Sequence, residues 1–424
     1  MAIPSKPMKL SVVSCMLLAM LAPFARTADN PVEQLAQDAR VKRALEWISA
    51  NQDWITEQQI RLSEIPAPEF SEGSRANALK KLFDLFGYKG RIDSVGNVIA
   101  ERPGSDPKNV ILIAAHIDTV FPAGTDVSVK RRASRLEGPG ISDNGAGVAA
   151  LVGLARGMNE GKIRTAMTVV FAGDVGEEGE GNLRGIRQLM ESYSGGLRAV
   201  IAIDGASVEH ITMQALASRR VEVTVTGPGG HSWSDFGLPN PITAIARAIV
   251  KFSAVRVPKD PRTTLNVGLI EGGTSVNAIP FSASMKVDMR SENEKELDHL
   301  EQVLHDSVQK GIEDEIAAVH ADPDSLDAKF KSLGVRPGGE IAADAPLLDA
   351  IRNVERFLGN RSRPERSSTD ANIPLSLGIP AIAVGGGGRG GGSHSLSEWY
   401  DPTDRDIGVK RILLTVLAVA GLQP

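Results

Sequence analysis

A histidine and an aspartate stand two residues apart after an apolar segment. His116 and Asp118 follow "VILIAA" (110–115). Residues i and i+2 at the end of a strand share a face, so both side chains can point into one site. The Asp118 carboxylate can then hold one imidazole nitrogen of His116 while the other nitrogen binds a metal ion. For this motif alone, an ordinary hydrogen-bonded pair is the alternative.

Two glutamates lie side by side in a glycine-rich turn. Glu177 and Glu178 occur in "GDVGEEGEG", after the apolar run 165–173. Adjacent carboxylates repel each other unless a cation or a shared proton relieves the repulsion. One glutamate would then bind a metal ion while the other carries a proton. A solvated acidic turn is the alternative here.

Three more residues extend this set. Asp143 precedes a helical pattern in "SDNGAGVAAL", Asp204 follows the run "AVIAI", and His394 follows a glycine-rich stretch. Asp143 can cap the helix or bridge two cations with its two oxygens, and Asp204 can simply form a turn. Together, two histidines and several carboxylates are the ligand set expected of a hydrolase with two metal ions.

The elements that must position these residues read as a sheet covered by helices. Four apolar runs have the continuous character of strands buried on both faces: 110–115, 165–173, 199–203 and 379–384. Helical patterns at 146–158 and 347–358 lie between them. This alternation predicts an α/β domain, in which ligands bind beyond the carboxyl ends of the strands.

The middle of the chain has a different character. Two segments alternate apolar and polar residues, and two are helical at a period of 3.6 residues: 219–227 with 282–291, and 241–252 with 294–320. We therefore expect an inserted α+β domain at 215–333, between catalytic parts at 29–214 and 334–424.

The first 28 residues read as an export signal. Lys6 and Lys9 precede an apolar core that is short for a membrane span. Cys15, the only cysteine, lies in this segment, so the processed chain would have no disulfide and no cysteine ligand. We expect an exported protein, periplasmic or extracellular if bacterial, without a membrane span. The net charge of −5 and the lack of a basic stripe argue against a nucleic-acid partner.

The order of the motifs identifies a family. "AHIDTV", "SDNGAG", "GEEGEGNLRG", "IDG" and "GGGSHSLSEW" resemble, in this order, the di-zinc exopeptidases and deacylases. That family includes peptidase T-like aminopeptidases, carnosine-type dipeptidases, carboxypeptidase G-like enzymes, acetylornithine deacetylase and succinyl-diaminopimelate desuccinylase. The resemblance covers nearly all of the chain after its N-terminal segment. It implies an α/β catalytic domain, a sheet with helices, and an inserted α+β lid or dimerisation domain.

The resemblance also implies a role for each candidate residue. The implied ligands of one Zn²⁺ are His116, Asp143 and Asp204, and those of the second are Asp143, Glu178 and His394. Asp143 would bridge two Zn²⁺ per chain, for which Co²⁺ or Mn²⁺ are alternatives. Glu177 matches the general base and Asp118 the partner of His116. The family usually has a cis peptide after the bridging aspartate, here Asp143–Asn144.

Three residues of the inserted domain match family positions that contact substrate. His231 in "GPGGHSW" matches the histidine that polarises the substrate carbonyl, often across a dimer interface. Asn277 in "SVNAIP" and Arg290 in "VDMRS" match positions at the substrate's polar end, where an arginine fork suits a carboxylate. A homodimer formed through the lid is therefore implied. Taken alone, His231 reads as a surface histidine and Arg290 as a charge at a strand end.

The implied reaction is amide hydrolysis. Two Zn²⁺ lower the pKa of a shared water, Glu177 takes its proton, and the hydroxide attacks a carbonyl polarised by a metal and by His231. Aspartate at position 204 is more typical of the family's aminopeptidases and dipeptidases, which favours a metallopeptidase acting on small peptides. An N-acyl amino acid deacylase or a carboxypeptidase is the alternative, followed by a non-catalytic binding protein.

Seven of the eight residues Gly385–Gly392 are glycine. The run fits G-x-G-x-x-G, but no GK[ST] follows and no helical pattern begins at its end, so it does not predict a phosphate-binding loop. We expect a backbone wall beside the substrate, because glycine has no Cβ to obstruct a close approach.

Overall fold

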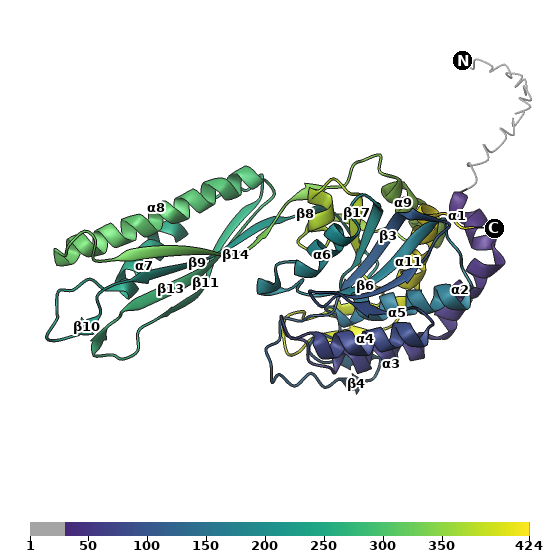
Figure 1. Cartoon of the computed structure of the whole chain (residues 1–424), viewed down its shortest axis with the longest axis horizontal. Coiled ribbons are helices and arrows are strands. Elements are labelled where there is room, and N and C mark those ends of the chain that lie inside the picture. Colours follow the sequence, from purple (N-terminus) through teal and green to yellow (C-terminus); the bar gives the residue numbers. More distant parts are fainter. Residues whose placement is uncertain (1–29, 424) are drawn as a thin grey trace, which may run out of the picture.

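The computed structural model describes residues 30–423. The expected export signal at 1–28, with Cys15, lies outside the described residues. Figure 1 shows two bodies side by side, a larger one on the right and a smaller one on the left, joined near β8 and β14. Within residues 30–423, no helix has the length and apolarity needed to cross a membrane.

A nine-stranded sheet forms the centre of the larger body, in the order β1-β2-β6-β3-β7-β17-β8-β15 with β16 beside β8. Its strands are β1 (Arg91–Ile92), β2 (Val98–Arg102), β3 (Asp106–His116), β6 (Met167–Asp174), β7 (Leu197–Ile203), β8 (His210–Ala215), β15 (Gly339–Glu340), β16 (Arg363–Ser367) and β17 (Ala381–Val384). The central strands β6, β3, β7 and β17 run parallel. Their carboxyl ends therefore share one edge, as the four apolar runs predict.

Helices pack against this sheet. They are α1 (Pro31–Gln37), α2 (Ala39–Ala50), α3 (Gln52–Ser63), α4 (Gly73–Leu85), α5 (Gly145–Glu160), α6 (Arg184–Ser192), α9 (Pro346–Leu358), α10 (Asn372–Ser376) and α11 (Arg405–Ala420). Helix α5 contacts β3 on one side and α2, α3 and α11 on the others. Its glycines and alanines allow this close packing, and thirteen of its sixteen residues are buried. The mixed α/β fold agrees with the sequence prediction.

A small sheet has the strand order β18-β19-β5-β4, and its strand β18 begins shortly after the carboxyl end of β17. Its strands are β4 (Lys130–Arg132), β5 (Arg135–Glu137), β18 (Arg389–Gly391) and β19 (Trp399–Asp401). The sheet joins two loops far apart in sequence, because β5 pairs with β19 through Glu137 and Trp399. The loop after β5 carries Asp143, and the loop before β19 carries His394.

The smaller body, which we call the inserted domain, has a sheet of four antiparallel strands in the order β11-β13-β9-β14. Its elements are β9 (Ala217–Thr226), β10 (Gly230–His231), α7 (Pro241–Ser253), β11 (Thr263–Gly272), β12 (Ala278–Ile279), β13 (Ser282–Ser291), α8 (Glu294–Val319) and β14 (Asp327–Arg336). Helices α7 and α8 pack on one face of the sheet and form a separate hydrophobic core with it. The alternating pattern of β9 and β13 leaves polar side chains on the other face.

Candidate metal centre and active site

The carboxyl edge of the large sheet brings several candidate residues together. His116 is the last residue of β3 and is the Cα partner of Asp174, the last residue of β6. The chain leaving β6 carries Glu177 and Glu178, and the chain leaving β7 carries Asp204. Because β3, β6 and β7 are parallel neighbours, their exits lie next to one another.

Asp143 lies just before α5 with its side chain directed at two histidines. Asn144 is the helix N-cap, and its side chain accepts a hydrogen bond from the Gly147 nitrogen. The capping alternative for Asp143 is therefore wrong. Its Oδ1 lies 3.3 Å from His116 Nε2, and its Oδ2 lies 3.3 Å from His394 Nε2. The peptide bond between Asp143 and Asn144 is cis.

Two groups of side chains around Asp143 have a donor set suited to metal ions. They are His116 with Asp143 and Asp204, and Asp143 with Glu178 and His394; within each group the potential ligand atoms lie within 4.8 Å of one another. The groups share Asp143, whose two oxygens face different histidines. Imidazole nitrogens and carboxylate oxygens suit Zn²⁺, so the chemistry of both groups fits a pair of such ions.

We call the two groups of candidate ligands the cluster. Asp118 is buried behind the cluster and binds the backbone of the turn that carries Glu177 and Glu178. Its Oδ1 accepts a hydrogen bond from the Glu177 nitrogen at 3.1 Å, and its Oδ2 accepts one from the Glu178 nitrogen at 2.9 Å. Its Oδ1 also lies 3.7 Å from His116 Nδ1. The carboxylate thus binds the backbone of both glutamates and faces Nδ1 of His116, but at 3.7 Å it does not make the expected hydrogen bond to that nitrogen.

Glu177 is buried beside the cluster and is paired with an arginine. Its Oε1 lies 2.9 Å from Nη1 of Arg336. Burial raises the pKa of Glu177 to about 8, although Arg336 and His116 act to lower it. One carboxylate oxygen of Glu177 lies within 4.8 Å of ligand atoms of His116 and Glu178. The side chain is therefore placed to exchange a proton with a group bound at the cluster.

The carboxylates set the protonation of the histidines in the metal-free chain. The carboxylates of Asp143 and Glu178 raise the pKa of His394 to about 10, and burial opposes them. Burial lowers the pKa of His116, but the nearby carboxylates of Asp118, Asp143 and Asp204 outweigh this effect and hold the pKa well above its usual value. Metal ions binding the same nitrogens must displace these protons.

Sequence reasoning missed Glu398, which holds the Asp143 loop. This fully buried carboxylate accepts hydrogen bonds from the backbone nitrogens of Gly140, Ser142 and Asp143, at 2.9, 2.7 and 2.7 Å. Its position four residues after His394 in "HSLSEW" is the one signal the sequence offers. Arg336 in "GVRPGG" was also missed, and nothing in its local sequence points to Glu177.

The glycine run packs closely against neighbouring loops. A Cβ on Gly385 would lie 2.1 Å from the Ala206 carbonyl oxygen, and one on Gly390 would lie 2.1 Å from Ser142 Oγ. Side chains at these two positions would clash with the chain's own atoms, so local packing requires glycine there. The run thus packs the approach to His394 against neighbouring loops, which the expectation of a wall for substrate alone did not include.

The three substrate-contact residues expected in the inserted domain do not gather at one place. His231 and Asn277 are neighbours, because β10 pairs with β12 and the Ser232 nitrogen donates to the Asn277 carbonyl. Figure 1 shows β10 at the end of the inserted domain far from the large sheet. Arg290 lies near the other end of β13, 2.8 Å from Asp288 Oδ2. A single chain therefore brings neither His231 nor Asn277 to the cluster.

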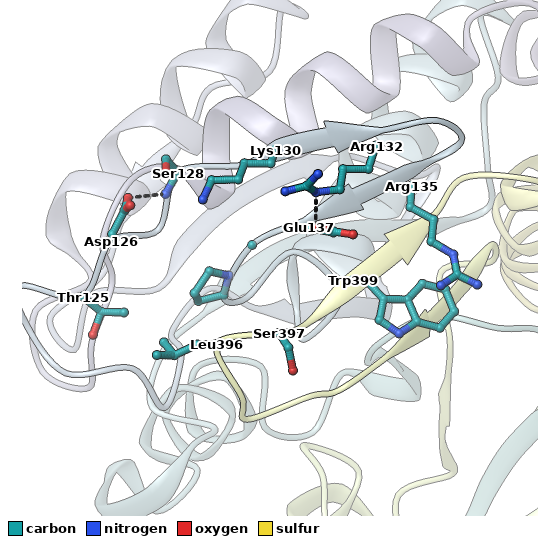
Figure 2. Close-up of a pocket in the computed structure, with 12 residues that line it drawn as sticks. Thr125, Asp126, Ser128, Lys130, Arg132, Arg135, Glu137, Leu396, Ser397 and Trp399 are labelled. Carbon is teal, nitrogen blue, oxygen red and sulfur yellow. Dashed lines mark hydrogen bonds and ion pairs between the residues drawn. The ribbon is translucent and has the colours of Figure 1, made fainter.

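A cavity of about 600 Å³ lies beside the loops that carry Asp143 and His394. Figure 2 shows Arg132 paired with Glu137, and Arg135 above the indole of Trp399 at 3.9 Å from the ring centroid. The cavity is lined by Thr125, Asp126, Ser128, Lys130, Arg132, Arg135, Glu137, Gly138, Pro139, Leu396, Ser397 and Trp399. A smaller cavity of about 190 Å³ adjoins Asp204.

Comparison with known proteins agrees with this geometry. The model of Peptidase family M20/M25/M40 matches residues 112–418. The chain belongs to this family of metallohydrolases and is therefore an enzyme of the kind that the sequence motifs indicate.

The relatives include a deacetylase and peptidases. Acetylornithine deacetylase of Myxococcus xanthus is 26% identical over 306 residues, covering 69% of this chain and 76% of the relative. Human carnosine dipeptidase 1 has a similar structure, with a TM-score of 0.71 at 14% identity over 89% of this chain and 98% of that one. Bacillus subtilis YxeP, described as a dinuclear metal-binding peptidase, has a TM-score of 0.62 at 18% identity over 88% and 99%.

Proposed function

We propose that the chain hydrolyses amide bonds of small peptides with two bound metal ions, as an exopeptidase of the aminopeptidase or dipeptidase type. The carrying observation is the Asp143 carboxylate, whose two oxygens each lie 3.3 Å from a different histidine Nε2. One carboxylate between two ligand groups suits a pair of ions rather than a single one. Aspartate at position 204 supports a peptidase, by resemblance to that branch of the family.

Several residues of the chain have separate roles in the proposed hydrolysis. Bound Zn²⁺ would supply the Lewis acidity that makes water acidic and a carbonyl electrophilic. Glu177 accepts the proton of the attacking water and later donates it to the leaving amine, so it acts first as base and then as acid. Asp118 holds the turn that carries Glu177, and Glu398 holds the loop that carries Asp143. His231 of a second copy would polarise the substrate carbonyl, and Asn277 and Arg290 would bind the polar end of the substrate.

An N-acyl amino acid deacylase is the second candidate, supported by the sequence similarity to acetylornithine deacetylase. The test uses purified protein with its metal content measured, and a panel of dipeptides, tripeptides and N-acetyl amino acids. Turnover of peptides with about two metal equivalents per chain supports the first proposal. Turnover of N-acyl substrates alone would replace it with the second, and no hydrolysis by the metal-loaded protein would reject both.

Two further proposals concern the location of the enzyme and its oligomeric state. The basic and apolar pattern of residues 1–28 supports export from the cell. The distance of β10 from the large sheet in Figure 1 supports a homodimer, because a second chain is then needed to bring His231 to the cluster. Sizing of the purified protein by light scattering tests the dimer.

A further inference from the structure

The turn that carries Glu177 is bound to the inserted domain by several of its strands. Contacts come from β9, β13 and β14, all near the junction between the two bodies. Arg220 of β9 donates to the Gly179 carbonyl, Lys286 of β13 lies 2.7 Å from Glu180 Oε1, and Arg187 beyond the turn donates to the Val335 carbonyl of β14 at 2.5 Å. The inserted domain is therefore in direct contact with the segment that holds the proposed base.

Arg336 binds Glu177 itself. It is the last residue of β14, and its side chain is buried, as is that of Glu177. Nη1 donates to Glu177 Oε1 at 2.9 Å and to Ser368 Oγ at 3.1 Å, and Nη2 donates to the backbone carbonyl of Glu177. One guanidinium therefore fixes both the main chain and the carboxylate of the same residue, which its planar fork of donors permits.

The contacts with Arg336 leave one carboxylate oxygen of Glu177 free to accept a proton. Arg336 occupies Oε1, whereas Oε2 of Glu177 has no hydrogen-bond partner among residues 30–423. A carboxylate held at one oxygen and at its own carbonyl has little freedom to rotate away from the cluster. Orientation of a reacting group is worth a large rate factor, and small displacements are costly.

We propose that Arg336 is a positioning residue for Glu177, through which the last strand of the inserted domain sets the direction of the proposed base. The inference rests on the proposed function, since it assigns Arg336 to the proton-transfer step. A merely structural role would be to attach the inserted domain to the large sheet. Arg187 provides a control for that role, because it binds the Val335 carbonyl in the same strand and makes no hydrogen bond to Glu177.

The test compares Arg336→Ala, Arg336→Lys and Arg187→Ala with the unmodified enzyme. Metal content, melting temperature, kcat and KM are measured for the best substrate of the peptide and N-acyl panel. Arg336→Ala should lose roughly 100-fold in kcat with little change in KM and with both metal equivalents retained. The kcat of Arg336→Lys should lie between the values of Arg336→Ala and the unmodified enzyme, because lysine keeps the charge but lacks the planar guanidinium group. Arg187→Ala should lose melting temperature but keep kcat.

Added guanidinium, far below denaturing concentrations, gives a second readout. It should restore part of the kcat of Arg336→Ala and should raise the melting temperature of the metal-free form of that variant. For Arg187→Ala, added guanidinium should change neither kcat nor the melting temperature in this way. Wild-type kcat in Arg336→Ala would overturn the proposal, as would an equal loss of kcat in Arg187→Ala. If Arg336→Ala fails to fold, wild-type kcat in Arg336→Lys overturns it. Absence of hydrolysis by the unmodified enzyme would instead reject the proposed function.

Discussion

The Glu398 carboxylate accepts a hydrogen bond from the backbone nitrogen of Asp143, with Oε1 2.7 Å away. The same carboxylate binds the nitrogens of Gly140 and Ser142. These bonds tie the loop after β5, which presents the shared carboxylate of the cluster, to the loop that carries His394. The placement of two candidate ligands therefore depends on one buried side chain.

Glu398→Ala should destabilise the fold and weaken metal binding together. The change leaves three buried N–H groups without their acceptor, which should lower the free energy of unfolding by about 3 kcal/mol. Denaturant unfolding and metal analysis measure the two effects. Glu137→Ala on the adjoining β5 is the control, because its partly exposed pair with Arg132 is worth at most about 1 kcal/mol. Equal losses in the two variants would contradict the role given to Glu398.

Glu177→Gln and Glu178→Gln should fail in different ways. Glu177→Gln keeps the size of the side chain but removes the proton acceptor, so kcat should fall by about 10²–10⁴-fold with both metal ions retained. Glu178→Gln replaces a proposed ligand and should lower the metal content. Steady-state kinetics and metal analysis on the same preparations separate the two roles. Amide hydrolysis at the wild-type rate by Glu177→Gln would show that another group is the base.

Metal affinity and the stability of the metal-free chain should depend on pH in opposite directions. The carboxylates of Asp143 and Glu178 raise the pKa of His394 to about 10. Because a metal ion must displace this proton, affinity should rise with pH up to that value. In the metal-free chain the raised pKa stabilises the fold fully below the unfolded-state value of about 6.5, and this contribution disappears as pH rises through about 10.

Calorimetry of metal binding in buffers of different ionisation enthalpy measures the protons released. Unfolding of the chelator-treated chain across the same pH range measures the stability. His394→Ala should release fewer protons and show a weaker pH dependence in both experiments. Metal binding without proton release near neutral pH would contradict the proposed competition.

Part of the candidate site could be predicted from sequence because three of its residues follow short, continuous apolar runs. His116 ends β3, and Glu177 and Asp204 follow β6 and β7, which are parallel neighbours of β3 in the mixed sheet, so strand order brings the three residues together. The interactions that support the cluster could not be predicted in this way. Glu398 lies 255 residues from Asp143, and Arg336 lies 159 residues from Glu177. Neither pair has a local pattern, because each contact forms only when separate loops meet in the folded chain.

The substrate-contact residues of the inserted domain show a second limit of sequence reasoning. Motif resemblance groups His231, Asn277 and Arg290 by function, but it does not give their places on the sheet. His231 and Asn277 meet at the β10–β12 pair, whereas Arg290 is eight residues along β13 from Ser282, close to the junction of the two bodies. In a strand, eight residues span roughly 26 Å. One chain therefore cannot direct all three residues at the same substrate.

A second copy of the chain should supply His231, and mixing two inactive variants tests this directly. His231→Ala keeps the metal cluster and Glu177, whereas Glu177→Gln keeps His231. If His231 acts across a dimer, a mixed dimer has one site with both groups intact, made from Glu177 of one chain and His231 of the other. Random exchange of equal amounts should then restore about a quarter of the wild-type activity.

The control places both substitutions in the same chain. A chain carrying both substitutions, mixed with wild type, forms dimers in which neither mixed site has both groups intact, so it should gain no activity above that of the remaining wild-type dimers. Light scattering and exchange of tagged chains must show that mixed dimers have formed. Activity near zero in a fully exchanged mixture of the two single variants would place His231 in the site of its own chain. That result would require the inserted domain to bring β10 to the large sheet, away from its position in Figure 1.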